Sequence, residues 1–159
     1  MSVSHPIADT YRRLYIAQTA VARAIERALL RCGVSLPQAI ALQVIGTADE
    51  TITATQLATY MGQERQSMTG LIDRMEARGW LSRTRDLPDR RAIRLALTAT
   101  GRAKLAEITP VAFNAVVQVF ERFDEERLAS MTAIFQEIYE AALACLDETQ
   151  QERTSAAAI

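Results

Sequence analysis

Residues 53–98 read TATQLATYMGQERQSMTGLIDRMEARGWLSRTRDLPDRRAIRLALT, and this stretch decides the fold. Thr53 opens a Thr-x-x-Gln capping box, in which a hydroxyl and an amide each satisfy a backbone N–H at the start of a helix. Gly62 stands where that helix turns into the next one, which we expect over residues 64–78, with Gly79 at its end. The stretch therefore begins with two helices joined by a tight turn.

The second of these helices has one apolar and one polar face. Met68, Leu71, Ile72 and Met75 recur at i, i+3, i+4 and i+7, which predicts a stripe that faces the core. The opposite face is polar or small, and it carries Arg65, Gln66, Thr69, Gly70, Asp73 and Arg74. It is either an ordinary solvated surface or a surface that contacts a polar partner.

Two short strands follow the helices, at Leu81–Arg85 and Ala92–Leu97. Apolar residues alternate along the second strand, so one of its faces is buried. Leu87-Pro88-Asp89 supplies the turn chemistry between the strands. Two strands alone are marginal, so they must pack on the helices. The whole pattern predicts a winged helix-turn-helix, which can place a helix in the major groove of DNA and an arginine in the minor groove.

Two more helices are expected before this stretch. Residues 8–31 carry an apolar stripe at steps of three, four or seven, and Gly33 suits the left-handed stop after it. Leu36-Pro37 opens the next helix, which runs through about Ile45, because the missing N–H of a first-turn proline costs nothing.

Two long helices are expected after it. Thr98 caps a helix from about Ala99 to Arg122, in which Pro110 introduces a bend. The last helix is expected from about Asp124 to Asp147. Its apolar residues share one side and are Leu128, Met131, Phe135, Ile138, Ala142 and Cys145.

We therefore expect a mainly α chain with a winged helix-turn-helix lobe over residues 35–98 and a helical dimerisation region over residues 1–34 and 99–150. Residues 151–159 are expected to be a disordered tail. The long terminal helices carry more apolar surface than so small a lobe can bury, which indicates a homodimer. The alternative is that they close the core of a monomer.

Charge is unevenly distributed along a chain whose formal net charge is −1. Residues 65–94 hold eight arginines and four acidic residues, and residues 121–152 hold nine acidic residues and two arginines. The first segment attracts phosphate and the second repels it, which would orient the molecule as it approaches DNA. Ordinary solvated helix faces are the alternative, and we prefer it for the acidic segment.

Several classes of protein are disfavoured. No apolar run is long enough to span a membrane, and the start of the chain lacks the apolar centre of a secretory signal, so we expect a cytoplasmic protein. His5 is the only histidine, and Cys32 and Cys145 are too few for a zinc site. We expect no metal, no cofactor and no enzymatic activity, because no nucleophile, base or ligand set is clustered.

Residues 57–101 resemble the MarR family of bacterial transcriptional regulators. The resemblance is most specific at Asp89-Arg90-Arg91, at the wing tip, and at Leu97-Thr98-Ala99-Thr100-Gly101 after it. It implies an intertwined homodimer that binds a pseudo-palindromic operator and represses transcription. It also implies a pocket for a small aromatic or phenolic effector, with Tyr11, Arg12 and Tyr15 as candidate liners. Tyrosines of a dimer core and a surface arginine are the alternative.

Eleven residues are predicted to form the DNA-binding site. The N-terminal residues of a recognition helix lie nearest the base edges, where arginine pairs with guanine and glutamine with adenine. We expect Arg90 in the minor groove, Asp89 bracing a neighbouring arginine such as Arg91, and Arg83 and Arg85 near phosphates. Arg94 is expected to be a solvated strand residue. The full set is Arg65, Gln66, Ser67, Thr69, Gly70, Arg74, Arg83, Arg85, Asp89, Arg90 and Arg91.

Two other functions stay open at this point. One is a winged-helix module whose arginines contact an acidic protein instead of DNA. The other is a regulator that senses oxidants through Cys32 or Cys145. We favour buried, inert thiols at both positions, because a cysteine on an apolar stripe behaves as a small hydrophobic residue.

Overall fold

The computed structural model describes residues 6–48, 52–63, 65–85 and 93–156. For residues 65, 66, 85 and 147–156 it describes the backbone alone. The chain divides into two compact units, Met1–Val117 and Gln118–Ile159. The first unit holds all the strands of the described residues.

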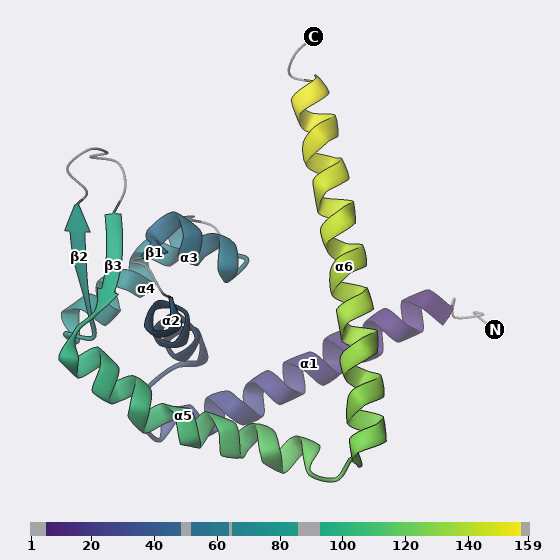
Figure 1. Cartoon of the computed structure of the whole chain (residues 1–159), viewed down its shortest axis with the longest axis horizontal. Helices are drawn as coiled ribbons and strands as arrows, with labels where there is room; N and C mark the ends of the chain where they lie inside the picture. Colours follow the sequence, from purple (N-terminus) through teal and green to yellow (C-terminus); the bar gives the residue numbers. More distant parts are fainter. Residues whose placement is uncertain (1–5, 49–51, 64, 86–92, 157–159) are drawn as a thin grey trace. The chain divides into compact units, whose positions relative to one another are not determined.

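Six helices and three short strands make up the described residues (Figure 1). They are α1 (Pro6–Leu30), α2 (Leu36–Thr47), β1 (Ile52–Thr53), α3 (Ala54–Tyr60), α4 (Arg65–Ala77), β2 (Leu81–Arg85), β3 (Ile93–Leu97), α5 (Ala99–Phe120) and α6 (Glu125–Ala156). This confirms the predicted mainly α fold with a winged helix-turn-helix at its centre.

The sheet is antiparallel with strand order β1-β3-β2. Leu81 of β2 faces Leu97 of β3 across the ladder, and Ile52 of β1 faces Leu95. Strand β1 was not predicted, because it has only two residues and the second of them, Thr53, opens the capping box of α3. This strand makes β3 the central strand of the sheet.

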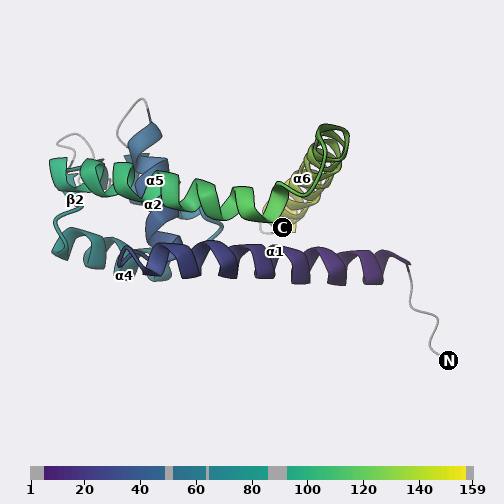
Figure 2. The same ribbon diagram turned by 90° about the horizontal axis from the view of Figure 1, so that it is seen from below.

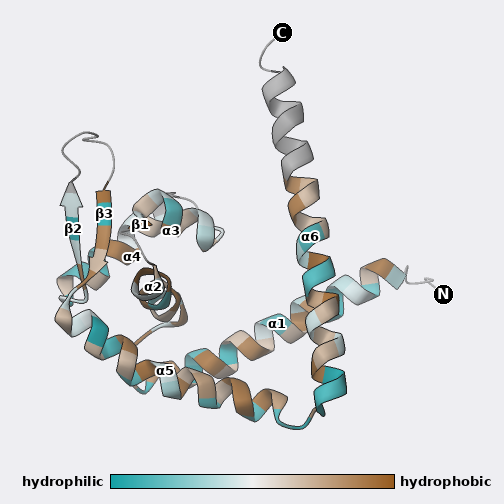
Figure 3. Cartoon of the chain, in the orientation of Figure 1, coloured by the Kyte–Doolittle hydropathy of each residue, from teal (hydrophilic) through white to brown (hydrophobic). Residues whose placement is uncertain are grey.

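One hydrophobic core holds the elements of the first unit together. Its largest fully buried side chains come from five helices, one strand and the connection between α1 and α2, and they are Leu29, Val34, Leu42, Leu57, Met68, Met75, Leu95 and Ile108. Helix α2 lies in the middle of this unit and is apolar over most of its surface (Figure 3). Figure 2 shows α1 and α5 running along the unit with α2 between them. The lobe is therefore completed by helices that lie outside residues 35–98.

That packing joins residues on both sides of positions 34 and 99 in one core. Leu29 of α1 and Ile108 of α5 belong to the core of the lobe, and Leu105 packs against it. A Cβ on Gly46 of α2 would lie 2.5 Å from the Leu105 side chain, so α2 and α5 are in close contact. The boundary between the units lies after Val117, within α5.

The N-terminal half of α1 extends beyond this core (Figure 2). Ile7, Tyr11, Tyr15 and Ile16 are all more than half exposed, whereas Leu29 near the helix end is completely buried. Gly33 follows α1 with φ 71°, as the left-handed stop requires, and the Val34 N–H donates to the Leu29 carbonyl.

The second unit contains the end of α5 and the long α6. Asp124 caps α6 by accepting a hydrogen bond from the Arg127 N–H at 2.9 Å. Leu128 and Met131 are half-buried, but the apolar side chains farther along are exposed. They include Ile134, Phe135, Ile138, Tyr139, Leu143 and Leu146.

Helix α6 is longer than the sequence analysis expected. Its backbone is helical through Ala156, whereas the last helix was expected to end at about Asp147 and a disordered tail was expected over residues 151–159. Gln, Glu, Arg and Ala dominate this segment, and none of them ends a helix as glycine or proline would. Residues 157–159 lie outside the described residues.

Candidate nucleic-acid interface

The helix-turn-helix is built by α3, a four-residue turn and α4. The Thr53 N–H donates to Gln56 Oε1 at 2.8 Å, and the Gln56 N–H donates to Thr53 Oγ1 at 3.2 Å, so the predicted capping box is formed. After α3, Gly62 takes φ 59° and the Gln63 N–H donates to the Ala58 carbonyl at 3.0 Å. These backbone bonds define the direction in which α4 begins.

Burial orients α4 as the hydrophobic pattern predicted. Met68, Leu71, Ile72 and Met75 are each at most 3% exposed, so the apolar stripe faces the core. The other face is therefore turned away from the core along the whole helix. It is the surface on which the predicted base-reading residues lie.

The structure describes four of the six predicted contact residues on α4 in full. Ser67, Thr69 and Arg74 are exposed, and Gly70 is half-buried. A Cβ on Gly70 would meet the Arg74 guanidinium at 3.4 Å and nothing else within 4 Å, so the Arg74 side chain lies beside the glycine on this face. Arg65 lies in the first turn of α4 and Gln66 follows it, but their side chains lie outside the described atoms.

The wing is formed by β2 and β3, with Arg83 opposite Leu95 and Arg85 opposite Ile93. The loop between the strands, residues 86–92, lies outside the described residues, as does the side chain of Arg85. The roles predicted for Arg85, Asp89, Arg90 and Arg91 therefore stay predictions.

Arg83 connects the wing to α4. Its guanidinium forms an ion pair with Asp73, and its Nε lies 3.0 Å from Glu76 Oε2. The Arg83 side chain is 25% exposed, while the two carboxylates are more exposed. The sequence analysis had placed Arg83 near phosphate and Asp73 on an outer face, and it missed this pairing. No sequence spacing could reveal it, because strand and helix meet only through the tertiary fold.

Arg94, on the central strand β3, is also less exposed than expected. It is half-buried, so the expectation of a solvated strand residue is corrected. Because β1 pairs with β3 at Thr53 and Arg94, this residue lies within the sheet and not at its edge.

The base of the wing is tied to the start of α5. The Thr98 N–H donates to the Trp80 carbonyl at 3.1 Å, and Thr98 Oγ1 caps α5 by accepting from the Gly101 N–H at 3.0 Å. A Cβ on Gly101 would lie 1.8 Å from the Trp80 carbonyl oxygen, so only glycine fits there. The Arg78 guanidinium lies 4.8 Å from the centre of the buried Trp80 ring, and its Nη1 donates to the Gly33 carbonyl.

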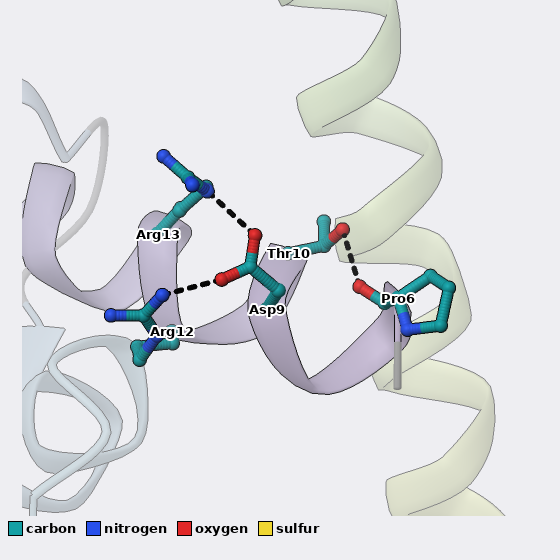
Figure 4. Close-up of polar contacts among 5 residues, drawn as sticks. All are labelled: Pro6, Asp9, Thr10, Arg12 and Arg13. Atoms are coloured by element: carbon teal, nitrogen blue, oxygen red, sulfur yellow. Dashed lines mark hydrogen bonds and ion pairs between the residues drawn. The ribbon is translucent and has the colours of Figure 1, made fainter. Parts of the chain in front are cut away.

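The predicted effector liners lie on the exposed half of α1. Tyr11 and Tyr15 are 67% and 60% exposed. Asp9 forms ion pairs with Arg12 at 2.5 Å and with Arg13 at 2.7 Å (Figure 4). The Arg13 guanidinium, followed by that of Arg12, holds the pKa of the Asp9 carboxyl below its usual range. Arg12 and Arg13 thus share one carboxylate within their own helix.

A cavity of about 310 Å³ lies elsewhere in the first unit. It is enclosed by the C-terminal part of α1, by α2, by Tyr60 of α3 and by the middle of α5. None of Tyr11, Arg12 and Tyr15 lines it. The effector role of Tyr11, Arg12 and Tyr15 stays a prediction.

The two cysteines differ in their exposure. Cys32 is half-buried against the core, but Cys145 on α6 is exposed, which corrects the expectation of two buried thiols. Among the described residues, no three His, Cys, Asp or Glu side chains gather into a possible metal site. None of the described helices combines the length and apolarity needed to cross a lipid bilayer.

Comparison with known proteins gives a consistent result. Residues 33–92 match the model of the MarR family. The HTH-type transcriptional repressor YetL of Bacillus subtilis is 26% identical over 101 residues, which cover 64% of this chain and 60% of that protein. The chain thus spans about three fifths of the length of this curated relative.

Solved structures share the fold over more of the chain. A MarR-family transcriptional regulator from Rhodococcus sp. RHA1 has a TM-score of 0.76 and 25% identity, covering 85% of this chain and 95% of that one. A mutant MarR from E. coli, solved in complex with operator DNA, has a TM-score of 0.78 and covers 87% of this chain and 99% of that one, at 17% identity. The second similarity shows the fold alone.

Proposed function

We propose that this chain, whose winged helix-turn-helix is similar to that of the MarR family, binds a pseudo-palindromic DNA operator as a homodimer and represses transcription. A small molecule releases it from the operator. Repression follows if the bound dimer blocks access of RNA polymerase to a promoter.

One observation carries the proposal: α4 is held by its buried stripe so that a polar face with Ser67, Thr69 and Arg74 is turned outward beside the wing. A helix of this kind enters the major groove, and its outward side chains meet base edges and phosphates. The Arg83 ion pairs with Asp73 and Glu76 hold the wing against the same helix, so both elements can meet one stretch of duplex.

Exposed apolar surface supports the homodimer. The outer half of α1 and the length of α6 each leave large apolar side chains in solvent, among them Tyr11, Ile16, Phe135 and Leu146. Helix faces that expose several large apolar side chains mark an interaction surface. A two-fold dimer would present two copies of α4, which matches an operator made of two half-sites.

The first test measures DNA binding directly. Duplexes selected from a random pool by the purified protein would supply the operator, and fluorescence anisotropy would give its affinity. We expect Arg74→Ala to weaken operator binding by about 1–3 kcal/mol. Arg127→Ala removes the same charge from the start of α6 and serves as the matched control, with unchanged affinity.

Salt dependence separates this proposal from a module that contacts only protein. Several phosphate contacts make the affinity for random duplex fall steeply between about 50 and 200 mM salt. Negligible binding to any duplex in dilute buffer, with Arg74→Ala indistinguishable from wild type, would support the protein-contacting module and contradict the proposal.

A further inference from the structure

Gly70 is the one glycine of the chain that the fold does not require. Three of the six glycines take a positive φ, and in two others a Cβ would lie less than 3.0 Å from atoms of another segment. Gly70 lies inside α4 without a positive φ, and a Cβ there would meet only the Arg74 guanidinium within 4 Å. Because glycine destabilises a helix interior relative to alanine, its presence calls for a reason outside the fold.

The Arg74 side chain lies over this glycine. Arg74 comes four residues after Gly70 and Ser67 comes three residues before it, so the three are neighbours in one row on α4. Helix side chains lean toward the N-terminus, and Arg74 Nη1 follows this lean to 3.4 Å from the position of a Gly70 Cβ. The guanidinium is thereby carried toward the end of the helix that lies nearest the base edges.

The charge of Arg74 is not neutralised by the acidic residues of its own helix. Asp73 and Glu76 both pair with Arg83 of β2. Among the residues that the structure describes, none with a carboxylate forms an ion pair with Arg74, and its side chain is exposed. Two parallel N–H groups of a guanidinium match the O6 and N7 acceptors of guanine in the major groove. Arg74 is thus a charged, outward group with the geometry that guanine requires.

We propose that Gly70 is a specificity-determining residue, because the space that it leaves lets the Arg74 guanidinium reach over it and read one guanine in each half-site of the operator. A larger side chain at position 70 would take that space and push the guanidinium away from the base. The inference rests on the proposed function. It adds the base that α4 selects and the residue that positions the group reading it.

A series of side chains at position 70 tests the space. Gly70→Ala leaves an ordinary contact with Arg74, so we expect the operator affinity and base preference of the wild type. Gly70→Leu needs the volume that the guanidinium occupies, and it weakens operator binding by about tenfold. Duplexes selected from a random pool by this variant lose the preference for guanine at one position of each half-site. Its thermal unfolding midpoint is not lowered, because leucine is the better helix former.

A double-mutant cycle separates the displacement of Arg74 from a clash between leucine and DNA. In an Arg74→Ala background, Gly70→Leu weakens operator binding by less than about twofold, because the group that leucine displaces is already gone. The same loss of affinity in both backgrounds would mean that the leucine itself meets the DNA. That result overturns the inference.

Arg74→Lys separates base reading from a phosphate contact. Lysine keeps the positive charge but lacks the planar fork, so we expect the salt slope to be retained and the guanine preference to be lost. Arg127→Lys at the start of α6 is the matched control and changes neither property. A lysine variant with the guanine preference of the wild type assigns Arg74 to a phosphate and overturns the inference.

The contact between Arg74 and Gly70 also has a readout without DNA. The Nε–H signal of Arg74 in a nitrogen-15 NMR spectrum, identified by its loss in Arg74→Ala, moves more in Gly70→Leu than in Gly70→Ala. An equal position in both variants overturns the placement of the guanidinium over the glycine. Operator binding with an unchanged base preference in Gly70→Leu overturns the inference and leaves the proposed function standing. Absence of duplex binding by the wild type contradicts the proposed function, and the reading of guanine falls with it.

Discussion

Gly101 shows how a single residue connects the wing to the rest of the molecule. Its missing side chain lets the first turn of α5 approach the Trp80 carbonyl, at a point where a Cβ would lie 1.8 Å from the oxygen. The obstacle is backbone, which cannot rotate away as a side chain can. The position of the wing relative to α5 therefore depends on a hydrogen in place of a methyl group.

We predict that Gly101→Ala lowers the free energy of unfolding by about 2–4 kcal/mol, because strand or helix must shift to relieve the overlap. Chemical denaturation measures the loss. Gly70→Ala is the matched control: its methyl group meets only the end of the flexible Arg74 side chain, and the change raises helix propensity. Equal stability of the two variants would contradict the predicted contact.

Arg90 allows a prediction that depends on the sequence alone. It lies in the wing loop, outside the described residues, between two strands whose register the structure gives. If it enters a minor groove, Arg90→Ala weakens operator binding by about 1–3 kcal/mol and leaves the thermal unfolding midpoint unchanged. Wild-type affinity in an anisotropy titration would remove Arg90 from the interface.

At the scale of elements, the pairing of β2 with α4 decides what Arg83 does. An arginine that contacts phosphate adds to the salt dependence of DNA binding, whereas one that only positions the wing does not. Because Arg83 already pairs with Asp73 and Glu76, we infer the positioning role. The partners are exposed, so the ion pairs themselves contribute at most about 1 kcal/mol to stability.

We predict that Arg83→Ala and Asp73→Ala weaken operator binding by similar factors and leave the salt slope unchanged. Removing Asp73 breaks the ion pair between β2 and α4, just as removing Arg83 does. The slope of affinity against salt concentration is the measurement. If Asp73→Ala instead tightens binding, by unmasking a cation, and Arg83→Ala reduces the slope by about one, Arg83 contacts phosphate as the sequence analysis had expected.

The elements also show why part of the structure could be predicted from the sequence. Local chemistry determines the capping box at Thr53, the stop at Gly79 and the stripe through Met68 and Met75, and all three were found. The two-residue β1 and the Arg83 ion pairs depend on segments distant in the chain, and both were missed. The last turns of α6 were not predicted, because their residues are mostly polar and permit a helix without requiring one.

The candidate site also combines features that local sequence predicts with features that only the tertiary fold determines. The outward face of α4 follows from periodicity, since buried positions imply exposed ones. The cavity of about 310 Å³ does not, because its walls come from four helices that are far apart in the sequence. The resemblance suggested Tyr11, Arg12 and Tyr15 as liners, and the cavity described here lies among other side chains.

On the scale of the whole molecule, the two units differ in what holds them together. The first has a continuous core, whereas the apolar side chains of α6 beyond Met131 are exposed. Each apolar side chain left in solvent forgoes about 1.5–3 kcal/mol of favourable burial, which a second chain could recover. This is why we place the dimer contacts on the terminal helices.

We predict that a chain ending at Phe123 is a folded monomer, because the core of the first unit lies entirely before that residue. Sedimentation velocity gives the mass, and circular dichroism shows whether the lobe is folded. A chain ending at Gln150 keeps the exposed apolar side chains of α6 and serves as the control that remains a dimer. A stable dimer of the shorter chain would refute the assignment.

The close packing of α5 against the Trp80 carbonyl at Gly101 has a consequence for how such a protein could diversify. Backbone atoms hold this junction, whereas Ser67 and Arg74 are exposed on α4. Exchanging those outward side chains would alter which base pairs are preferred without disturbing the scaffold that presents them. Paralogues descended from this chain could thus acquire new target genes by a few surface replacements, while the junction itself tolerates almost none.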